Sequence, residues 1–194
     1  MRKHVLFDYG NVISLAQDAA DVARMAQGVP GFEERYWDLR LDFDRDTLDP
    51  EAYWSRVYGR PLGGAELDRV IAMDVASWSR PNEETVAIVD ELAADDVPVA
   101  LLSNAPVCIA DGLDELPFMA PISPRFYSGR MGLVKPDLEI YRRVAEGLGV
   151  PPGDIVFIDD RLENIAGAEA AGMAGIHFRD AATLRDDLKL ALRG

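Results

Sequence analysis

One stretch decides the fold of this 194-residue chain: Val5-Leu6-Phe7-Asp8-Tyr9-Gly10-Asn11-Val12-Ile13. Its first three residues are apolar and stand directly before a carboxylate. A short apolar run of this kind is typical of a strand that is covered on both faces. Three further runs have a similar character, at residues 97–102, 155–158 and 174–178, and residues 126–129 are a candidate for one more strand. Together the runs predict a mainly parallel sheet.

The segments between these runs carry the pattern of helices. Pro81 precedes the first helix, and the second begins at Pro136 and ends before Gly149, which are positions where proline and glycine commonly mark helix ends. The predicted helices cover residues 82–94, 136–148, 161–171 and 181–192. Strands that alternate with helices in this way predict an α/β fold with a doubly wound sheet.

Residues 15–79 interrupt this alternation. They contain helical patterns and glycine-rich turns but no strand signal, and they hold all three tryptophans of the chain. We therefore expect a small all-helical cap domain over residues 15–79, inserted after the first strand. Residues 1–14 and 80–194 would together form the α/β core domain.

The net charge of −14 restricts the partners of the protein. A chain this acidic is repelled by nucleic acids and by anionic membranes, so we expect neither as a partner. No segment approaches the roughly 18 apolar residues that span a bilayer. The single cysteine, Cys108, excludes an internal disulfide and is typical of a reducing compartment. These features predict a cytoplasmic protein and leave its oligomeric state open.

Polar residues follow the predicted strands at the points where the strands end. Ligands of open α/β sheets bind beyond these carboxyl ends, so residues found there should share one site. They are Asp8 after the first run, Ser103 and Asn104 after the second, and Asp159 and Asp160 after the third, with Lys135 standing before the helix at Pro136.

These residue types complement one another chemically. Neighbouring carboxylates repel each other unless a cation lies between them, and a few hard oxygen ligands suit Mg²⁺, which keeps several waters and accepts a substrate phosphate into its shell. A lysine adds fixed positive charge, and a serine hydroxyl can bind phosphate oxygens. Aspartate is a known covalent nucleophile in such reactions. The set therefore predicts magnesium-dependent phosphoryl transfer.

Four short motifs, in this order, resemble those of the haloacid dehalogenase-like hydrolase superfamily. They are residues 5–13, Leu101-Leu102-Ser103-Asn104, Val134-Lys135-Pro136-Asp137, and Phe157-Ile158-Asp159-Asp160 with Asn164 four residues on. The pattern looks closest to a branch that includes sugar-phosphate phosphatases of the α-glucose-1-phosphatase type and the N-terminal phosphatase domain of soluble epoxide hydrolases.

The resemblance implies a role for each matching residue. Asp8 would be the nucleophile and a metal ligand, Gly10 would offer its carbonyl to Mg²⁺, and Asp160 would bind the metal directly. Ser103 would hold the transferring phosphoryl group with Asn104 beside it, and Lys135 would pair with Asp8 and the phosphate. Asp159 or Asn164 would act on the metal through water. The implied activity is hydrolysis of a small phosphorylated metabolite, with a sugar phosphate as one candidate, through an aspartyl-phosphate.

Gly10 departs from the usual pattern of these phosphatases, which carry a second aspartate there as general acid and base. Loss of such a group commonly costs about 10² to 10⁴ in rate. The leaving group could need little protonation, as an anomeric phosphate would, or Asp44, Asp46 or a water could replace the missing acid. The remaining alternative is an impaired protein that serves binding or regulation. We favour an active enzyme, because the branch that the chain resembles also has glycine at this position.

A metal-independent haloacid dehalogenase is a different interpretation of the same fold. Those enzymes attack carbon, need no metal and do not typically keep a paired acidic fourth motif. Asp159 and Asp160 therefore argue against this activity.

Overall fold

The computed structural model describes residues 3–193, so residues 1, 2 and 194 of the expected core domain lie outside the described part. Five strands form one sheet, in which every pair of neighbours is parallel and the order is β3-β2-β1-β4-β5. The strands are β1 (His4–Phe7), β2 (Val99–Ser103), β3 (Arg125–Tyr127), β4 (Ile155–Asp159) and β5 (Ala174–His177). The predicted α/β fold with a mainly parallel sheet is confirmed.

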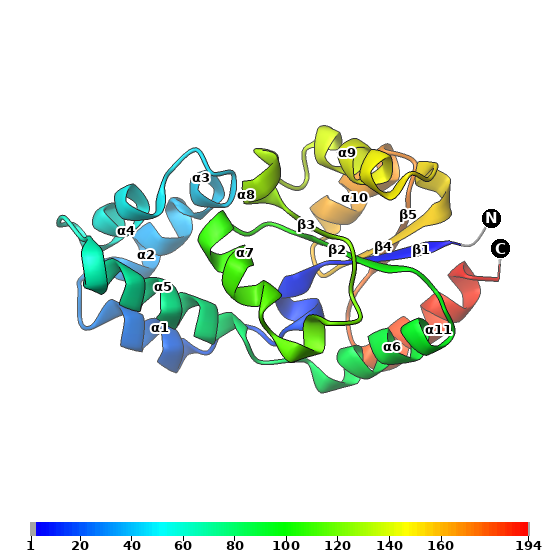
Figure 1. Cartoon of the computed structure of the whole chain (residues 1–194), viewed down its shortest axis with the longest axis horizontal. Helices are drawn as coiled ribbons and strands as arrows, with labels where there is room; N and C mark the ends of the chain where they lie inside the picture. Colours follow the sequence, from blue (N-terminus) through cyan, green and yellow to red (C-terminus); the bar gives the residue numbers. More distant parts are fainter. Residues whose placement is uncertain (1–2, 194) are drawn as a thin grey trace.

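Helices cover both faces of the sheet, as Figure 1 shows. The helices α6 (Glu83–Ala94) and α11 (Ala181–Ala191) lie on one side, and α9 (Leu138–Leu148) and α10 (Leu162–Ala170) lie on the other. Val5 and Phe7 of β1 pack into the hydrophobic cluster of the first pair, whereas Leu6 between them packs into that of the second pair. Because side chains alternate along a strand, a strand between two helical layers must be apolar at every position.

Five α-helices lie between β1 and α6, and no strand occurs among them in the described chain. They are α1 (Ala19–Ala26), α2 (Phe32–Asp38), α3 (Arg40–Asp44), α4 (Pro50–Tyr58) and α5 (Gly64–Trp78). They stand together beside the sheet, at the left of Figure 1, and bury a hydrophobic cluster of their own around Tyr53 and Trp54. The expected all-helical insertion after the first strand is therefore present.

The two chain segments that join this insertion to the sheet lie side by side. Ser14 and Pro81 form an antiparallel bridge, and the amide of Asn82 donates to the carbonyl of Ile13 at 2.8 Å. The insertion thus leaves and rejoins the rest of the chain at one place, close to the end of β1.

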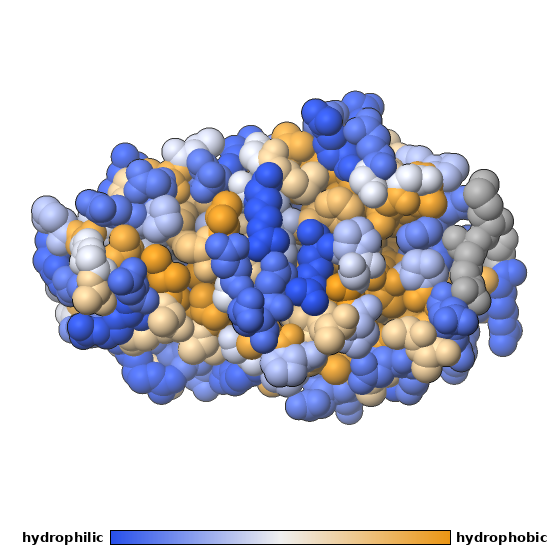
Figure 2. Space-filling view, in the orientation of Figure 1, coloured by the Kyte–Doolittle hydropathy of each residue, from blue (hydrophilic) through white to orange (hydrophobic). Residues whose placement is uncertain are grey.

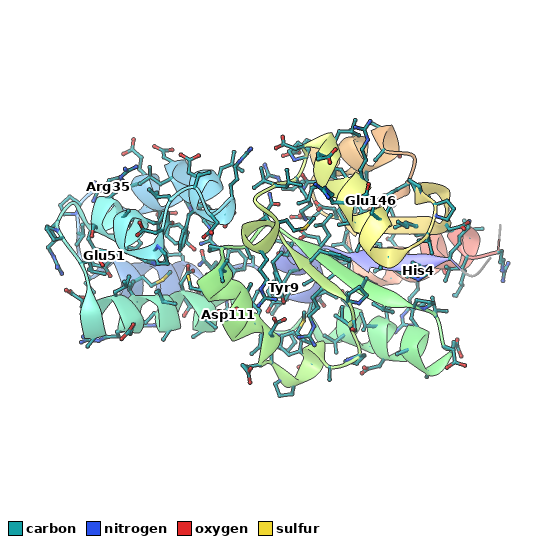
Figure 3. All side chains as sticks on the ribbon, turned by 45° about the horizontal axis from the view of Figure 1, so that its top comes forward. His4, Tyr9, Arg35, Glu51, Asp111 and Glu146 are labelled. Carbon is teal, nitrogen blue, oxygen red and sulfur yellow. The ribbon has the colours of Figure 1, made fainter. Side chains whose placement is uncertain are left out.

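Hydrophilic side chains cover much of the face seen in Figure 2, and hydrophobic ones show as patches between them. Within residues 3–193, every helix is too short or too polar to cross a bilayer. In Figure 3, Tyr9 lies at the end of β1 that faces the insertion, while His4 lies at the opposite end of the strand. The polar residues that follow the strands therefore lie on the side of the insertion.

Candidate active site

A cavity of about 390 Å³ lies between the carboxyl ends of the strands and the helical insertion. Seven of the eight site residues predicted from the sequence line it: Asp8, Gly10, Ser103, Asn104, Lys135, Asp160 and Asn164. The eighth, Asp159, is fully buried next to them. Residues that are up to 156 positions apart in the sequence are thus brought to one place by the parallel sheet.

The ammonium group of Lys135 joins two carboxylates. Its Nζ lies 2.6 Å from Asp8 Oδ1 and 2.7 Å from Asp159 Oδ2, and all three side chains are buried. Burial alone would lower the pKa of Lys135, but the two neighbouring carboxylates outweigh it and raise that pKa. The lysine therefore stays charged throughout the neutral range.

Asp8 is held in a setting that opposes its ionisation. Burial raises the pKa of its carboxyl group, Lys135 lowers it, and the charge of Asp159 raises it again. A cation beside Asp8 would act in the same direction as Lys135 and keep the carboxylate ionised.

Both side-chain oxygens of Asp159 accept hydrogen bonds from neighbouring protein groups. Oδ1 accepts from the amide of Arg161 at 2.9 Å, Oδ2 accepts from Lys135, and Asn164 Nδ2 lies 3.0 Å from each oxygen. Asp159 therefore anchors Lys135 and Asn164, and its lone pairs are less available to a cation than those of Asp8.

Asn104 fixes the backbone of Lys135 through two hydrogen bonds. Its Nδ2 donates to the Lys135 carbonyl at 3.0 Å, and its Oδ1 accepts from the Lys135 amide at 2.8 Å. Ser103, the last residue of β2, is buried at the cavity wall, and the structure records no hydrogen bond of its hydroxyl to another described residue. The serine hydroxyl is free to bind a ligand, whereas the asparagine amide positions the lysine.

An irregular turn, η1 (Tyr9–Ile13), carries the chain away from Asp8. Asn11 in this turn has a φ of 59°, a conformation that asparagine tolerates better than most residues. Its Nδ2 donates to Asp160 Oδ2 at 2.8 Å, and the Asp160 carbonyl lies 3.0 Å from His177 Nε2. The turn and β5 thus hold Asp160 from two sides.

The carboxylates form a group that fits a hard cation. One oxygen from each of Asp8, Asp159 and Asp160 lies within 4.8 Å of the others. Since both oxygens of Asp159 accept hydrogen bonds, the carboxylates of Asp8 and Asp160 are the ones that could hold a cation. Two carboxylates, with a backbone carbonyl and waters, match the donor set that Mg²⁺ prefers.

The insertion contributes a second, less acidic wall. Arg40 Nε donates to Asp44 Oδ1 at 2.8 Å, and Arg40 Nη1 lies 3.2 Å from Asp74 Oδ2. Arg40 and Asp44 are buried and line the cavity, together with the exposed side chains of Trp37 and Leu41. This wall faces the residues at the strand ends.

A comparison with models of protein families shows the family of this chain. The family model described as haloacid dehalogenase-like hydrolase matches residues 3–172, which is most of the sequence. The chain belongs to the haloacid dehalogenase-like hydrolases. It is therefore an enzyme, as the sequence motifs predicted.

Individual relatives are similar to this hydrolase over different lengths. A sesquiterpene phosphatase of Aspergillus oryzae is 25% identical over 92% of the chain and 90% of its own length. Flavin mononucleotide hydrolase 1 of Arabidopsis thaliana is 40% identical, but over 52% of the chain and 41% of its own length. The crystal structure of a Bacteroides thetaiotaomicron enzyme of this family, in complex with magnesium and inorganic phosphate, has a TM-score of 0.76 at 19% identity, and the match covers 95% of this chain and 99% of that one. That likeness shows the shared fold.

Several residues of the hydrolase's cavity had no role in the sequence prediction. Asn11 could have been noticed as an asparagine next to a glycine, the residue types that tolerate unusual turns. Arg40 gave no comparable signal, because a charged residue on a helix is usually exposed. Of the two carboxylates named as substitute acids, Asp44 lines the cavity, while Asp46 is exposed and outside the lining.

Proposed function

We propose that this hydrolase is a magnesium-dependent phosphatase of small phosphorylated metabolites, with Asp8 as the nucleophile. The observation that carries the proposal is the position of Asp8: its carboxylate is buried, bonded to Lys135, and close enough to Asp160 to share a cation. The phosphatase relatives support this reaction class.

The residues of the cavity can perform a substitution at phosphorus. Asp8 attacks the phosphorus atom, an Asp8–phosphorus bond forms, and the bond to the leaving oxygen breaks. Lys135 and the hydroxyl of Ser103 bind the phosphoryl oxygens, whose charge is spread over them in the transition state. Water then hydrolyses the aspartyl-phosphate, which releases inorganic phosphate and restores the Asp8 carboxylate.

The metal site of this proposal consists of Asp8, Asp160 and the carbonyl of Gly10. Mg²⁺ bound there would supply positive charge that neutralises the phosphoryl oxygens and orients them. Asn11 holds Asp160, while Asp159 and Asn164 support the site from behind. Outer-shell partners of this kind fix the orientation of metal ligands.

We further propose a division of the chain into a core domain, residues 1–14 and 80–194, and a cap domain, residues 15–79. The separate hydrophobic cluster of the insertion and the paired connections at Ser14 and Pro81 support it. In such an arrangement the cap covers the site and selects the substrate. Sugar phosphates are one candidate class. The named substrates of the relatives, a sesquiterpene phosphate and flavin mononucleotide, are others.

The test is release of phosphate from a generic aryl phosphate. We expect turnover with Mg²⁺, loss of turnover in excess chelator, and loss of turnover in the Asp8→Asn variant. Asp90→Asn, an exposed substitution on α6, serves as the matched control and should keep full activity.

Other outcomes would point to the alternative functions. Release of halide from a haloacid without added metal would support a dehalogenase. A folded protein that binds Mg²⁺ and phosphate but turns over none of a broad panel of phosphate esters would support a binding or regulatory role. Full activity in excess chelator would refute the metal-dependent mechanism.

A further inference from the structure

The position two residues after Asp8 offers no proton donor. A Cβ atom added to Gly10 would lie 3.4 Å from Cζ3 of Trp78, the last residue of α5, so the indole covers this position. The φ of Gly10 is −65°, a value that other residues adopt, so the backbone does not require glycine here. The cavity must therefore supply the proton for a leaving alkoxide from another place.

Asp44 is the one carboxylate, besides Asp8 and Asp160, among the described residues that line the cavity. It ends α3, and two contacts fix it. Its Oδ1 accepts from Arg40 Nε at 2.8 Å, and its main-chain carbonyl accepts from the hydroxyl of Ser128, in the segment after β3, at 2.6 Å. No hydrogen bond to Oδ2 is recorded among the described residues, so this oxygen remains available to a ligand.

The surroundings of Asp44 favour a carboxyl group that exchanges its proton near neutral pH. Burial raises the pKa of Asp44 to about 6, although Arg40 opposes this. This value includes two smaller effects: the charge of Asp74 raises the pKa, and that of Lys135 lowers it. Two tyrosines add titratable groups to this network: Tyr36, whose hydroxyl bonds to both Arg40 and Asp74, and Tyr53, which lies close enough to feel the charges of Asp44 and Arg40.

We propose that Asp44 is the general acid and general base of the hydrolase, a proposal that rests on the phosphatase function given above. As Asp8 bonds to phosphorus and the phosphorus–oxygen bond of the ester breaks, the carboxyl proton of Asp44 passes to the leaving oxygen, and the alcohol departs. The Asp44 carboxylate then takes a proton from the water that attacks the aspartyl-phosphate. Phosphate leaves, and both carboxyl groups return to their starting state.

The experiment compares two esters in the Asp44→Asn variant. A simple alkyl phosphate has a poor leaving group and needs the proton, so we expect its kcat/KM, which reports the transfer of the phosphoryl group to Asp8, to fall by about 10² to 10⁴. An aryl phosphate with a strongly acidic phenol needs little protonation, and we expect it to lose far less. The Asp46→Asn variant, changed at an exposed position outside the cavity, should leave both rates unchanged.

A second variant separates catalysis from support of Arg40. Asp74 also contacts Arg40 but is fully buried and does not line the cavity, so Asp74→Asn weakens the same network without removing the acid. At a pH well below 6, where Asp44 keeps its proton in both proteins, we expect it to affect the two esters equally. An equal loss of kcat/KM on both esters in Asp44→Asn would overturn the proposal, because it would indicate a structural role.

The wild-type enzyme provides a measurement that needs no variant. Its kcat/KM for the alkyl ester should fall as the pH rises above about 6, since Asp44 loses its proton there, whereas the kcat/KM for the aryl ester should lack this decline. Identical profiles would overturn the assignment. If the wild-type protein hydrolyses neither ester, or if Asp8→Asn stays active, the proposed phosphatase function itself fails.

An independent observation concerns the organic part of the substrate. The described chain exposes five large hydrophobic side chains, and two of them, Trp37 (46% exposed) and Leu41 (51%), line this one cavity. Ile109 and Leu113 of α7 (Val107–Asp114), which are buried, add apolar side chains to the lining of the same cavity. A substrate that reaches the cavity from solvent meets these side chains next to the phosphate-binding residues.

Few polar groups on this wall remain for a sugar. The hydroxyl of Tyr9 already donates to the carbonyl of Trp78 at 2.8 Å. The polar groups that remain on this side of the cavity are Arg40, Asp44 and the indole Nε1 of Trp78, which has no hydrogen-bond partner among the described residues. Hydroxyl groups buried here without partners would cost free energy, whereas hydrocarbon would gain it. We infer that the preferred substrate is the phosphate ester of a mainly apolar alcohol, either a hydrocarbon chain or a planar ring system. This inference also rests on the phosphatase function.

A pair of substrates and a pair of variants test this inference. The kcat/KM of a long-chain alkyl phosphate should exceed that of a hexose 1-phosphate. Trp37→Ser and Leu41→Ser should each reduce the ratio of these two values by about 10- to 200-fold. Leu190→Ser, at a side chain that is 71% exposed and outside the cavity, should preserve it. A preference for the hexose phosphate, or an unchanged preference in both variants, would overturn the inference while the phosphatase function stands.

Discussion

Replacement of Lys135 by methionine would remove the positive charge that lies between two buried carboxylates. Lys135 Nζ lies 2.6 Å from Asp8 and 2.7 Å from Asp159, and the lysine side chain is 1% exposed. Breaking a buried ion pair on one side costs about 3–5 kcal/mol, because the remaining charge stays buried without a partner. Total stabilities are about 5–15 kcal/mol, so the Lys135→Met protein should fold but be clearly weakened.

Urea unfolding, followed by tryptophan fluorescence in the presence of chelator, measures this loss. For a chain of this length, about 3–5 kcal/mol corresponds to a decrease in Tm of roughly 6–20 °C. Lys189→Met is the matched control, since its side chain is 64% exposed and its contact with Asp186 is a surface ion pair at 3.2 Å. Such pairs contribute about 0–1 kcal/mol.

The double variant Lys135→Met, Asp159→Asn isolates the interaction. If the lysine stabilises the fold through the carboxylates, the double variant should recover part of the loss, because one of the two unpaired charges is gone. The deficit of the single variant should also shrink as the pH falls, since protonation of the carboxyl groups removes their repulsion. A Lys135→Met protein as stable as Lys189→Met would refute the reasoning.

Three further predictions concern other parts of the fold. Gly129→Ala should destabilise the protein by about 1–3 kcal/mol, because the added Cβ would lie 2.8–3.0 Å from backbone atoms of the segment after β2. In the same unfolding assay, the control Gly153→Ala should be near neutral, because the nearest atom to its added Cβ is 4.0 Å away. At Asp114, burial is outweighed by hydrogen bonds from Arg125 and its neighbours, which lower the pKa of the carboxyl group. The ionised Asp114 should therefore add about 1 kcal/mol to the free energy of unfolding above the ordinary pKa of 3.8, and this contribution should be lost as the pH falls through the pKa in the folded state. The stabilities of wild type and Asp114→Asn should then converge in acid. Asn11→Ala should raise the Mg²⁺ concentration for half-maximal activity by about 10- to 100-fold, because Asp160 loses the donor that orients it.

Much of the core could be predicted from the sequence, because its strands are short apolar runs that end in polar residues. The predicted strand and helix ends differ from the observed ones by at most two residues. The strand β3 was harder to predict, since Arg125 begins it with a charged side chain. That arginine bonds to the carbonyls of Ile122 and Met119 and to Asp114, contacts that only the folded chain reveals.

The cap side of the site shows where sequence patterns are insufficient. Tyr53 and Trp54 are buried in the insertion, as expected of aromatic residues, but Trp37 is exposed at the cavity. Helical periodicity does not distinguish a core position from a position that faces a ligand. The contact of Arg40 with Asp74 joins residues 34 positions apart, and no local pattern encodes it.

Trapping of the covalent intermediate tests the central claim about Asp8 most directly. Enzyme that is turning over an aryl phosphate with Mg²⁺ is quenched in acid, and its intact mass and peptides are measured. The account predicts a fraction of the chain heavier by one phosphoryl group, located on Asp8 and absent from Asp8→Asn. Turnover in which the phosphoryl group is found on another residue, or in which Asp8→Asn remains active, would contradict it.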